Sequence, residues 1–434
     1  MYKCASDKSK TLITAILSKS IDRDKCKSTF ITHLLILFLQ IPIRHHFKGM
    51  ERYGNYNEKT YRLNFKKYGT SYDIKDLSSS RDTNDKFFDF RWFNQSLITD
   101  YLSDNLLVVF DPSFLPKSGK STYGVSHRWS GCAGKAKWGM ELGGLGVVDL
   151  DCQSAFHYEG ILTPSDEELQ SKATTLLEHY AQIIVERRDD LSCFSNYLCV
   201  DGFFSKKSFV DTIKSDTDLE VVSKLRKDSH LRYLYNGPKT GKRGRPKKFD
   251  GKVDISNIKS RYFKTVLEDD EKIVHEAIVW ANALERKIKL AYVQFKNEQG
   301  DLTNRYVLLF STDLKLSALE IVEFYTARFH IEFLFRDAKQ HTGLTHCQAR
   351  KEEKIYFHVN TALTAVNIAK IAHWIECPCD AQGNRPPFSL SSIKTLYFNE
   401  LNLNLFISMF DIDPNTEINK AKYQLLINFG SMAA

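Results

Sequence analysis

The sequence lacks any apolar run long enough to cross a membrane. Its most apolar stretch, residues 30–43, contains His33 and Gln40 and is flanked by Lys27 and Arg44. A membrane-spanning helix needs about 20 consecutive apolar residues, so this shorter stretch predicts a buried helix of a water-soluble protein. We therefore expect a cytoplasmic protein with no membrane partner.

The cysteines do not form a recognisable framework. They are nine in number and scattered along the chain, which argues against the disulfide scaffold of small secreted domains. Cys377 and Cys379 flank a proline, but no second cysteine pair or histidine pair lies at the spacing of a zinc site. We expect structural or solvent-facing thiols.

The sequence also has only a small excess of positively charged over negatively charged side chains. The 61 Lys and Arg residues only slightly outnumber the 53 Asp and Glu residues, and the net charge is +8. This balance is compatible with a nucleic acid partner but does not identify one. A chain of 434 residues without internal repeats or low-complexity tracts predicts about two to four globular domains.

The pattern of apolar residues changes along the chain. The first hundred residues have helical periodicity, and residues 77–86 form a polar linker. From about residue 105, short apolar runs alternate with helical segments, which is typical of an α/β domain. The predicted strands are 106–110, 143–150, 155–162, 197–200 and 219–225.

Two helices of this domain begin with a capping box. Ser165 with Glu168 opens a helix predicted to continue to Val185, and Ser317 with Glu320 opens one predicted over 317–340. Between strand 219–225 and the second helix lies a β-rich block, which interrupts the alternation. Its predicted strands are 273–280, 287–295 and 306–310.

Two acidic residues directly follow predicted buried strands. Asp111 comes after 106–110, and Asp201 comes after 197–200. Ligands bind at the carboxyl ends of strands in open α/β sheets, so these two acids are candidates for one site. Ordinary turn chemistry also places Asp after a strand, and this alternative stays open.

The helix predicted over 317–340 carries a third acid in a distinctive setting. At about 100° per residue, Tyr325, Arg328, Glu332 and Lys339 fall within an arc of about 60°. A solvated ion pair from Arg328 to Glu332 is the simpler interpretation, but it explains neither the tyrosine nor the distant lysine.

Three carboxylates without a catalytic His or Cys favour hard divalent cations. Mg²⁺ prefers oxygen ligands, and two such ions about 3.5–4 Å apart assist phosphodiester cleavage. Asp111, Asp201 and Glu332 are then the candidate metal ligands. Arg328, Lys339 and Tyr325 are candidates for holding DNA phosphates beside the metals.

The spacing Tyr325-x2-Arg328-x3-Glu332-x6-Lys339 resembles, without a gap, the Y-R-E-K signature of DDE transposases of the bacterial insertion-sequence-four type. Asp111 in FDPSFLPKSGKSTYG resembles the block around the first catalytic Asp of that family, and Asp201 in YLCVDGFFSKKSF resembles the second. FRDAKQHTGLTHCQAR, after Glu332, and GRPKK at 244–248 are also similar. The resemblance covers roughly residues 50–370.

The resemblance implies an RNase H-like core interrupted by a β-rich insertion. It implies Asp111, Asp201 and Glu332 as the catalytic, metal-binding triad, and Tyr325, Arg328 and Lys339 as contacts to the phosphates of the element ends. The expected cofactors are two Mg²⁺ or Mn²⁺ ions. The expected reaction is hydrolytic nicking at the ends of the element, followed by attack of the freed 3′-hydroxyl on target DNA. The expected assembly is a homodimer on double-stranded DNA.

The expected domain organisation combines the pattern with the resemblance. It consists of a helical, DNA-binding N-terminal region (1–100), the first part of the core (101–235), the β-rich insertion (236–312), the second part of the core with the helix that carries Glu332 (313–375), and a C-terminal tail (376–434).

Two lysines near Asp111 are further candidates for DNA binding. Ser118-Gly119-Lys120-Ser121 is not a P-loop, because the first glycine would have to stand at the position of Phe114. Lys117 and Lys120 are DNA contacts near the metals or solvated turn lysines, and both interpretations stay open.

A basic loop and a tryptophan in the β-rich block are the remaining DNA-binding candidates. Residues 242–248 resemble an AT-hook, and Arg243, Arg245, Lys247 and Lys248 are expected to contact DNA or to lie in a solvated loop. Trp280 is a candidate for stacking on an extruded base, with a core role as the alternative.

One N-terminal helix, predicted from an N-cap at Asn57 to Tyr68, has a basic face and an aromatic face. It is either a recognition helix of a helix-turn-helix unit or an amphipathic scaffold helix. The basic residues are Lys59, Arg62 and Lys66, and the aromatic residues are Tyr61, Phe65 and Tyr68.

Two rival functions remain open at this stage. One is an RNase H-like metal-dependent nuclease without strand transfer, which would not need Tyr325, Arg328 and Lys339 together. The other is an inactive, domesticated DNA-binding protein, which would be expected to have lost one of the three acids.

Overall fold

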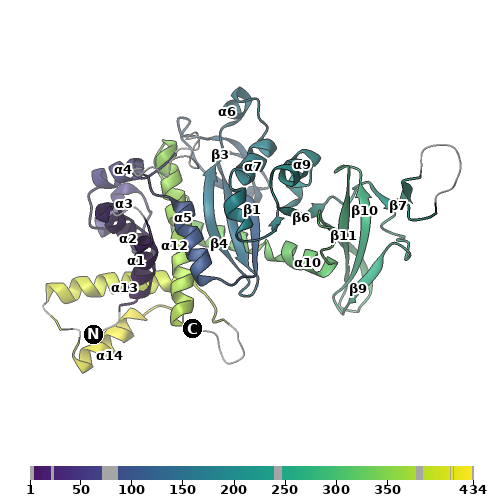
Figure 1. Cartoon of the computed structure of the whole chain (residues 1–434). Helices are drawn as coiled ribbons and strands as arrows, with labels where there is room; N and C mark the ends of the chain where they lie inside the picture. The colour runs from purple at the N-terminus through teal and green to yellow at the C-terminus, as the bar shows by residue number, and fades with distance from the viewer. Residues whose placement is uncertain are drawn as a thin grey trace.

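The computed structural model describes residues 4–20, 24–70, 87–238, 247–377, 385–410, 412–413 and 415–432. Within these residues, the chain forms a mixed sheet of 12 strands, and most of the helices pack around the part of the sheet that contains β1, β3 and β4, which confirms the predicted α/β class (Figure 1). No described helix is both long and apolar enough to span a membrane.

The core of the sheet is built around β1 (Leu106–Pro116). β1 pairs with antiparallel β3 (Lys135–Asp149) and with parallel β5 (Tyr197–Cys199). β4 (Ser154–Leu162) extends the sheet beyond β3, and β6 (Glu220–Leu225) extends it beyond β5. The predicted strands are thus present, and their arrangement is consistent with an RNase H-like core.

Two predictions about element boundaries were wrong. Asp111 lies inside β1 and not after it, because antiparallel pairing with β3 continues as far as Pro116 opposite Gly139. The helix predicted over 165–185 is two helices, α6 (Asp166–Ser171) and α7 (Leu176–Val185). The interruption follows from Ala173, which has a positive φ of 49°, and from a second capping box at Thr175.

Helices cover both faces of the core sheet. A side chain at Gly143 would contact Phe110 and Tyr180 of α7, whereas one at Gly144 would overlap Phe335 of α11. Because successive residues of a strand point to opposite faces, α7 and α11 lie on opposite sides of β3. The remaining helices of the core are α8 (Arg188–Ser192), α9 (Lys207–Asp216), α10 (Ala318–Ala327) and α11 (His330–Gln340).

The β-rich block extends the same sheet. Its last strand, β12 (Leu302–Ser311), pairs with β6 in antiparallel fashion, and the order continues β12-β11-β10-β7-β8. The other strands are β7 (Leu231–Leu234), β8 (Phe249–Lys252), β9 (Lys264–Glu268), β10 (Lys272–Ala281) and β11 (Arg286–Lys296). The domain boundaries 236 and 312 stay predictions.

The described N-terminal region is helical, as predicted. Its helices are α1 (Asp7–Ser18), α2 (Lys25–Gln40), α3 (Phe47–Tyr53), α4 (Glu58–Lys67) and α5 (Phe90–Tyr101). Asn57 caps α4 by accepting the Thr60 N–H at 2.8 Å, and the aromatic face with Tyr61 and Phe65 is buried. The basic face with Lys59 and Lys66 is exposed. The predicted linker 77–86 lies outside the described residues.

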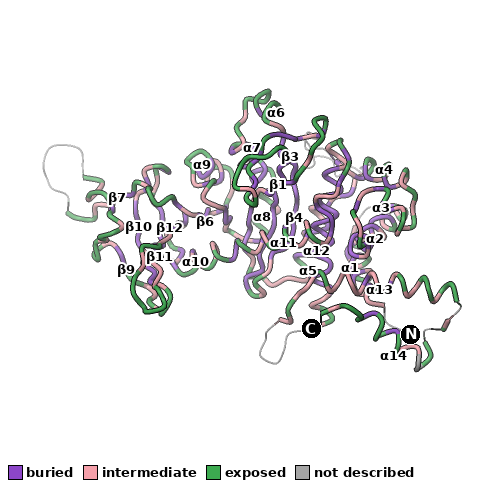
Figure 2. The backbone as a smooth tube through the Cα atoms, turned by 180° about the vertical axis from the view of Figure 1, so that it is seen from behind, coloured by how far each residue is buried: buried purple, intermediate pink, exposed green. Residues whose placement is uncertain are grey.

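The long helix α12 (Glu352–Glu376) is buried over most of its length (Figure 2). Two of its asparagines complete the hydrogen bonding of β4, which in the described sheet pairs with β3 alone. Asn367 accepts the N–H of His157 at 2.8 Å and donates to the same residue's C=O at 2.7 Å. Asn360 bonds both backbone groups of Gly160 in the same way. These amides take the place of a neighbouring strand.

We expect Asn367→Leu to lower the free energy of unfolding by about 3 kcal/mol, because it leaves two buried backbone groups of His157 without partners. Urea unfolding followed by circular dichroism measures the change. Thr361→Val is the matched control on α12, since Thr361 bonds only the C=O of Phe357 in its own helix. Equal stability of Asn367→Leu and the wild type would contradict the proposed role of the amide.

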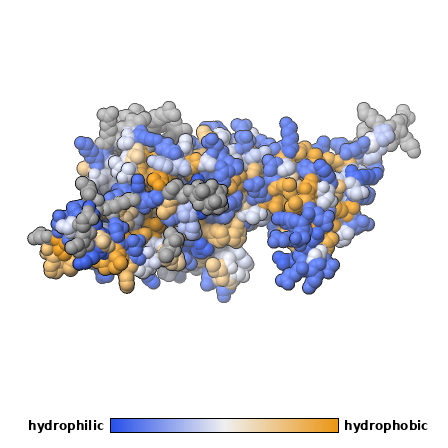
Figure 3. Space-filling model, turned by 90° about the horizontal axis from the view of Figure 1, so that it is seen from below, coloured by the Kyte–Doolittle hydropathy of each residue, from blue (hydrophilic) through white to orange (hydrophobic). Residues whose placement is uncertain are grey.

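The C-terminal helices α13 (Leu390–Met409) and α14 (Glu417–Ile427) expose many apolar side chains. Figure 3 shows apolar atoms at this end of the molecule, to the left of the view. The exposed side chains include Leu405, Phe406, Met409, Phe410, Leu425, Leu426, Phe429 and Met432.

Candidate active site

Asp111 lies on β1, and Asp201 follows the end of the adjacent parallel strand β5 at the same height. In the register of β1 and β5, Val109 is opposite Cys199, and each aspartate comes two residues later. Residues two apart in a strand share a face, so both carboxylates project from the face covered by α11. Asp201 also accepts the Phe203 N–H at 2.9 Å and begins the 3₁₀ helix η2 (Gly202–Phe204). Its turn role and its place in a site are therefore compatible.

The helix predicted over 317–340 is divided into α10 and α11. At the junction, the N–H groups of Ile331 and Glu332 bond the carbonyls of Arg328 and Phe329, three residues earlier, at 3.1 Å. These tighter turns separate α10 from α11. The prediction of one continuous helix was wrong, although Tyr325, Arg328, Glu332 and Lys339 still gather on one side.

Arg328 connects the two elements of the site. Its Nη1 donates to Asp111 Oδ1 at 3.0 Å, and its Nη2 donates to Glu332 Oε1 at 3.4 Å. Its guanidinium also lies 5.5 Å from the centre of the Tyr325 ring. The Arg328 side chain is only 8% exposed. One buried cation therefore joins a carboxylate of β1 to a carboxylate of α11.

Lys339 reaches the sheet two residues beyond Asp111. Its Nζ donates to Ser113 Oγ at 2.8 Å, and Ser113 lies on the same face of β1 as Asp111. Gly144 lies opposite Asp111 on β3. It allows α11 to pack closely against the sheet, because any side chain at this position would overlap Phe335 of α11. The sequence analysis did not identify Ser113 or Gly144, since neither belongs to the signature.

The pKa of Asp111 responds to the charges of the other two acids. The pKa of Asp111 is raised to about 7, mainly by burial and also by the negative charges of Asp201 and Glu332, while the positive charge of Arg328 opposes the increase. Burial likewise raises the pKa of Tyr325 to about 12, with a contribution from Asp201. A buried carboxyl group among like charges is typical of functional sites.

The donor chemistry of this cluster fits hard divalent cations. Asp111, Asp201 and Glu332 offer only carboxylate oxygens, the ligands that Mg²⁺ and Mn²⁺ prefer. Their oxygens do not all lie within 4.8 Å of one another; in the described ranges, the trio that meets this spacing is Cys4, Asp7 and Glu400. Arg328 lies between two of the acids and acts as their counter-charge.

Most of the other predicted DNA contacts lie apart from this cluster. Lys117 donates to the C=O of Cys347, so its ammonium already has a protein partner. Lys120 is exposed. Trp280 lies on β10, five strand spacings or about 24 Å across the sheet from β1, and its ring is 5.5 Å from that of Phe249.

The basic loop is only partly described. Arg243 and Arg245 lie outside the described residues. Lys247 forms a 2.7 Å ion pair with Asp250, and Lys248 is exposed. The DNA contacts predicted for these residues, for Lys117, Lys120 and for Trp280, stay predictions.

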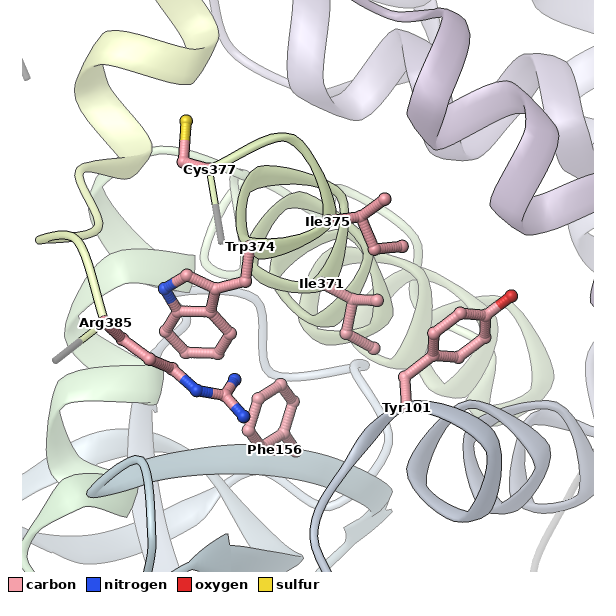
Figure 4. Close-up of a pocket in the computed structure, with 7 residues that line it drawn as sticks. All are labelled: Tyr101, Phe156, Ile371, Trp374, Ile375, Cys377 and Arg385. Carbon is pink, nitrogen blue, oxygen red and sulfur yellow. The ribbon is translucent and has the colours of Figure 1, made fainter. Parts of the chain in front are cut away.

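A cavity of about 230 Å³ lies elsewhere, at the C-terminal end of α12 (Figure 4). It is mostly apolar, and Arg385 stacks 4.9 Å from the Trp374 ring. None of the described residues that line it carries a carboxylate. The acidic cluster is instead part of the open surface, since Glu332 is 41% exposed, as a site for a large polymeric substrate requires.

Residues 163–368, slightly less than half of the chain, match the family model of the transposase DDE domain. The matched range includes Asp201, Tyr325, Arg328, Glu332 and Lys339. Asp111 precedes it and is connected to the others through Arg328. No curated protein sequence matches the chain. The domain match supports a DDE transposase, for which DNA is the implied substrate.

Proposed function

We propose that this protein is a DNA transposase of the insertion-sequence-four type, which cuts at the ends of its element and joins them to target DNA. The single observation that carries the proposal is the Arg328 guanidinium, which bonds both Asp111 and Glu332. It unites the first acid of the sequence pattern with the Y-R-E-K residues of the two helices. The domain match supports the same conclusion from sequence alone.

Asp111, Asp201 and Glu332 would hold two divalent ions, Mg²⁺ or Mn²⁺, whose chemistry when bound is activation of a water and stabilisation of the leaving oxygen. The protein's own task is to place a phosphodiester against these carboxylates. Of the two acids bonded to Arg328, Glu332 is the more accessible, since its side chain is 41% exposed and that of Asp111 is 17% exposed. The DNA strand therefore approaches from the side of α11.

Three side chains beside the acids are suited to hold phosphates. Arg328 Nε is buried and has no hydrogen-bond partner within the described chain, and a phosphate oxygen would satisfy it. Lys339 projects its ammonium to the same face of β1. Tyr325 supports the guanidinium with its ring. Together they supply charge-assisted hydrogen bonds that fix the strand.

We expect Lys339→Gln to weaken binding of an element end. The slope of log K against the logarithm of the salt concentration is expected to become shallower by about one. The reason is the loss of one phosphate contact. Fluorescence anisotropy of labelled DNA at several salt concentrations measures both quantities. Lys172→Gln, at an exposed lysine that ends α6, is the matched control. An unchanged salt slope for Lys339→Gln would contradict the phosphate contact.

A homodimer is part of the proposal, because joining two element ends requires both ends in one complex. The apolar side chains exposed on α13 and α14 support a second copy as the partner. Contiguous exposed apolar surface of this kind is typical of protein interfaces.

A strand-transfer assay tests the proposal against its rivals. The protein is incubated with Mg²⁺, a target plasmid, and a duplex that carries the element's own end with a free 3′-hydroxyl. We expect covalent joining of the duplex to the plasmid. Cleavage of intact ends without joining would favour the RNase H-like nuclease, and DNA binding with neither reaction would favour the inactive, domesticated protein.

A further inference from the structure

A two-stranded ribbon beside the site exposes aromatic side chains. It consists of β2 (Ser126–Ser130), the short 3₁₀ helix η1 (Gly131–Ala133) and the first residues of β3. Trp129 is 64% exposed and Trp138 is 38% exposed, whereas tryptophan is highly buried on average. The ribbon continues beyond β1, whose pairing with β3 ends at Gly139.

The strand register places these rings on the same face of the sheet as Asp111. Asp111 is opposite Gly144, and Trp138 lies six residues earlier on β3, so both point to one side. His127 is opposite Trp138, with ring centroids 5.3 Å apart, and Trp129 follows two residues later. Neither ladder has a register shift in this part. The aromatic face therefore begins about 20 Å along the strand from Asp111.

The ribbon also carries exposed basic side chains. Residues 126–140 contain no Asp or Glu, and of their basic residues Arg128 is buried and paired with Asp166, which leaves Lys135 and Lys137 at the surface. Lys135 and Lys137 are exposed and alternate along β3 with the aromatic face. Cys132, at the turn of the ribbon, is also exposed. The complementary partner of such a surface is a polyanion.

We propose that this ribbon binds unpaired nucleotides of the DNA strand that leads to the carboxylate site, with Trp129 and Trp138 stacking on their bases. Bases within a duplex already stack on their neighbours, so an exposed indole finds a free base face only in unpaired DNA. Lys135 and Lys137 supply positive charge to the phosphates. The inference rests on the proposed function and adds a binding surface to it.

Binding measurements in EDTA test this surface without requiring cleavage. Fluorescence anisotropy compares a labelled duplex that has a short unpaired extension with a blunt duplex of the same sequence. We expect Trp129→Ala to weaken binding of the extended duplex about tenfold and to leave the blunt duplex nearly unchanged. Trp129→Phe retains an aromatic ring and is expected to recover most of the affinity. Leu302→Ala removes an apolar side chain that is 53% exposed on β12, and it is the matched control.

The result that would overturn the inference is equal binding of the extended duplex by Trp129→Ala and the wild type, or an equal loss for both DNAs. Thermal melting of each variant shows that it is folded. Failure of the wild type to cleave or join DNA, with selective loss of binding in Trp129→Ala, would reject the transposase activity and leave the ribbon as a DNA-binding surface. Cleavage by the wild type, without selective loss of binding in Trp129→Ala, would reject the ribbon as a DNA-binding surface and leave the proposed activity standing.

Discussion

Glu332→Gln is expected to slow metal-dependent cleavage at an element end by about 10³-fold or more, while DNA binding is retained. The substitution keeps the size of the side chain and removes its negative charge. The resulting amide is a weaker ligand for a hard cation than the carboxylate. Gel analysis of nicked products in Mg²⁺ and in EDTA measures the effect.

The control for this prediction lies on the neighbouring helix. Glu323 on α10 is exposed, and it lies on a different helix from Glu332. Glu323→Gln is therefore expected to cleave like the wild type. Nicking by Glu332→Gln at the wild-type rate would show that the reaction does not use this carboxylate.

The second large effect is a dependence of metal binding on pH. The apparent affinity for Mn²⁺ is expected to decrease about tenfold for each pH unit below about 7. The cause is Asp111, whose pKa is raised to about 7, mainly by burial and also by the nearby charges of Asp201 and Glu332. Below this pH the carboxyl group carries a proton that a metal ion must displace.

The sign of the accompanying stability change follows from the same shift. A carboxyl group whose pKa is raised in the folded state stabilises the metal-free protein. The full stabilisation is present at pH values below the pKa of the unfolded state, about 3.9. That contribution is lost as the pH rises through about 7. Calorimetric titration with Mn²⁺ at pH 6 and pH 8 measures the affinity and the proton release. A constant affinity over this interval would contradict the raised pKa of Asp111.

The sequence was sufficient to predict which side chains gather on α10 and α11. The helical period placed Tyr325, Arg328, Glu332 and Lys339 on one side, and the structure joins Arg328 to Glu332 at 3.4 Å. It could not predict the interruption between α10 and α11, because no proline or glycine marks it. The partners of Arg328 and Lys339 on β1, Asp111 and Ser113, depend on tertiary packing that no local pattern encodes.

Other features were missed for identifiable physical reasons. The apolar run 106–110 predicted a buried strand correctly but ended it too early, because Asp111 and Pro112 are typical of turns. The asparagines of α12 gave no signal, since their partners are backbone groups of a distant strand. The aromatic ribbon had a signal that was not used. Residues 112–140 lack acids and contain Trp129 and Trp138.

The central claim is that Asp111, Asp201 and Glu332 form one metal site, and the most direct test is a crystal structure with Mn²⁺. Anomalous scattering identifies each bound ion without reference to activity. We expect Mn²⁺ held by oxygens from all three side chains, with Arg328 displaced from at least one of the two carboxylates that it now bonds. Mn²⁺ bound only elsewhere, for example by Cys4, Asp7 and Glu400, with Arg328 still joining Asp111 and Glu332, would contradict the account.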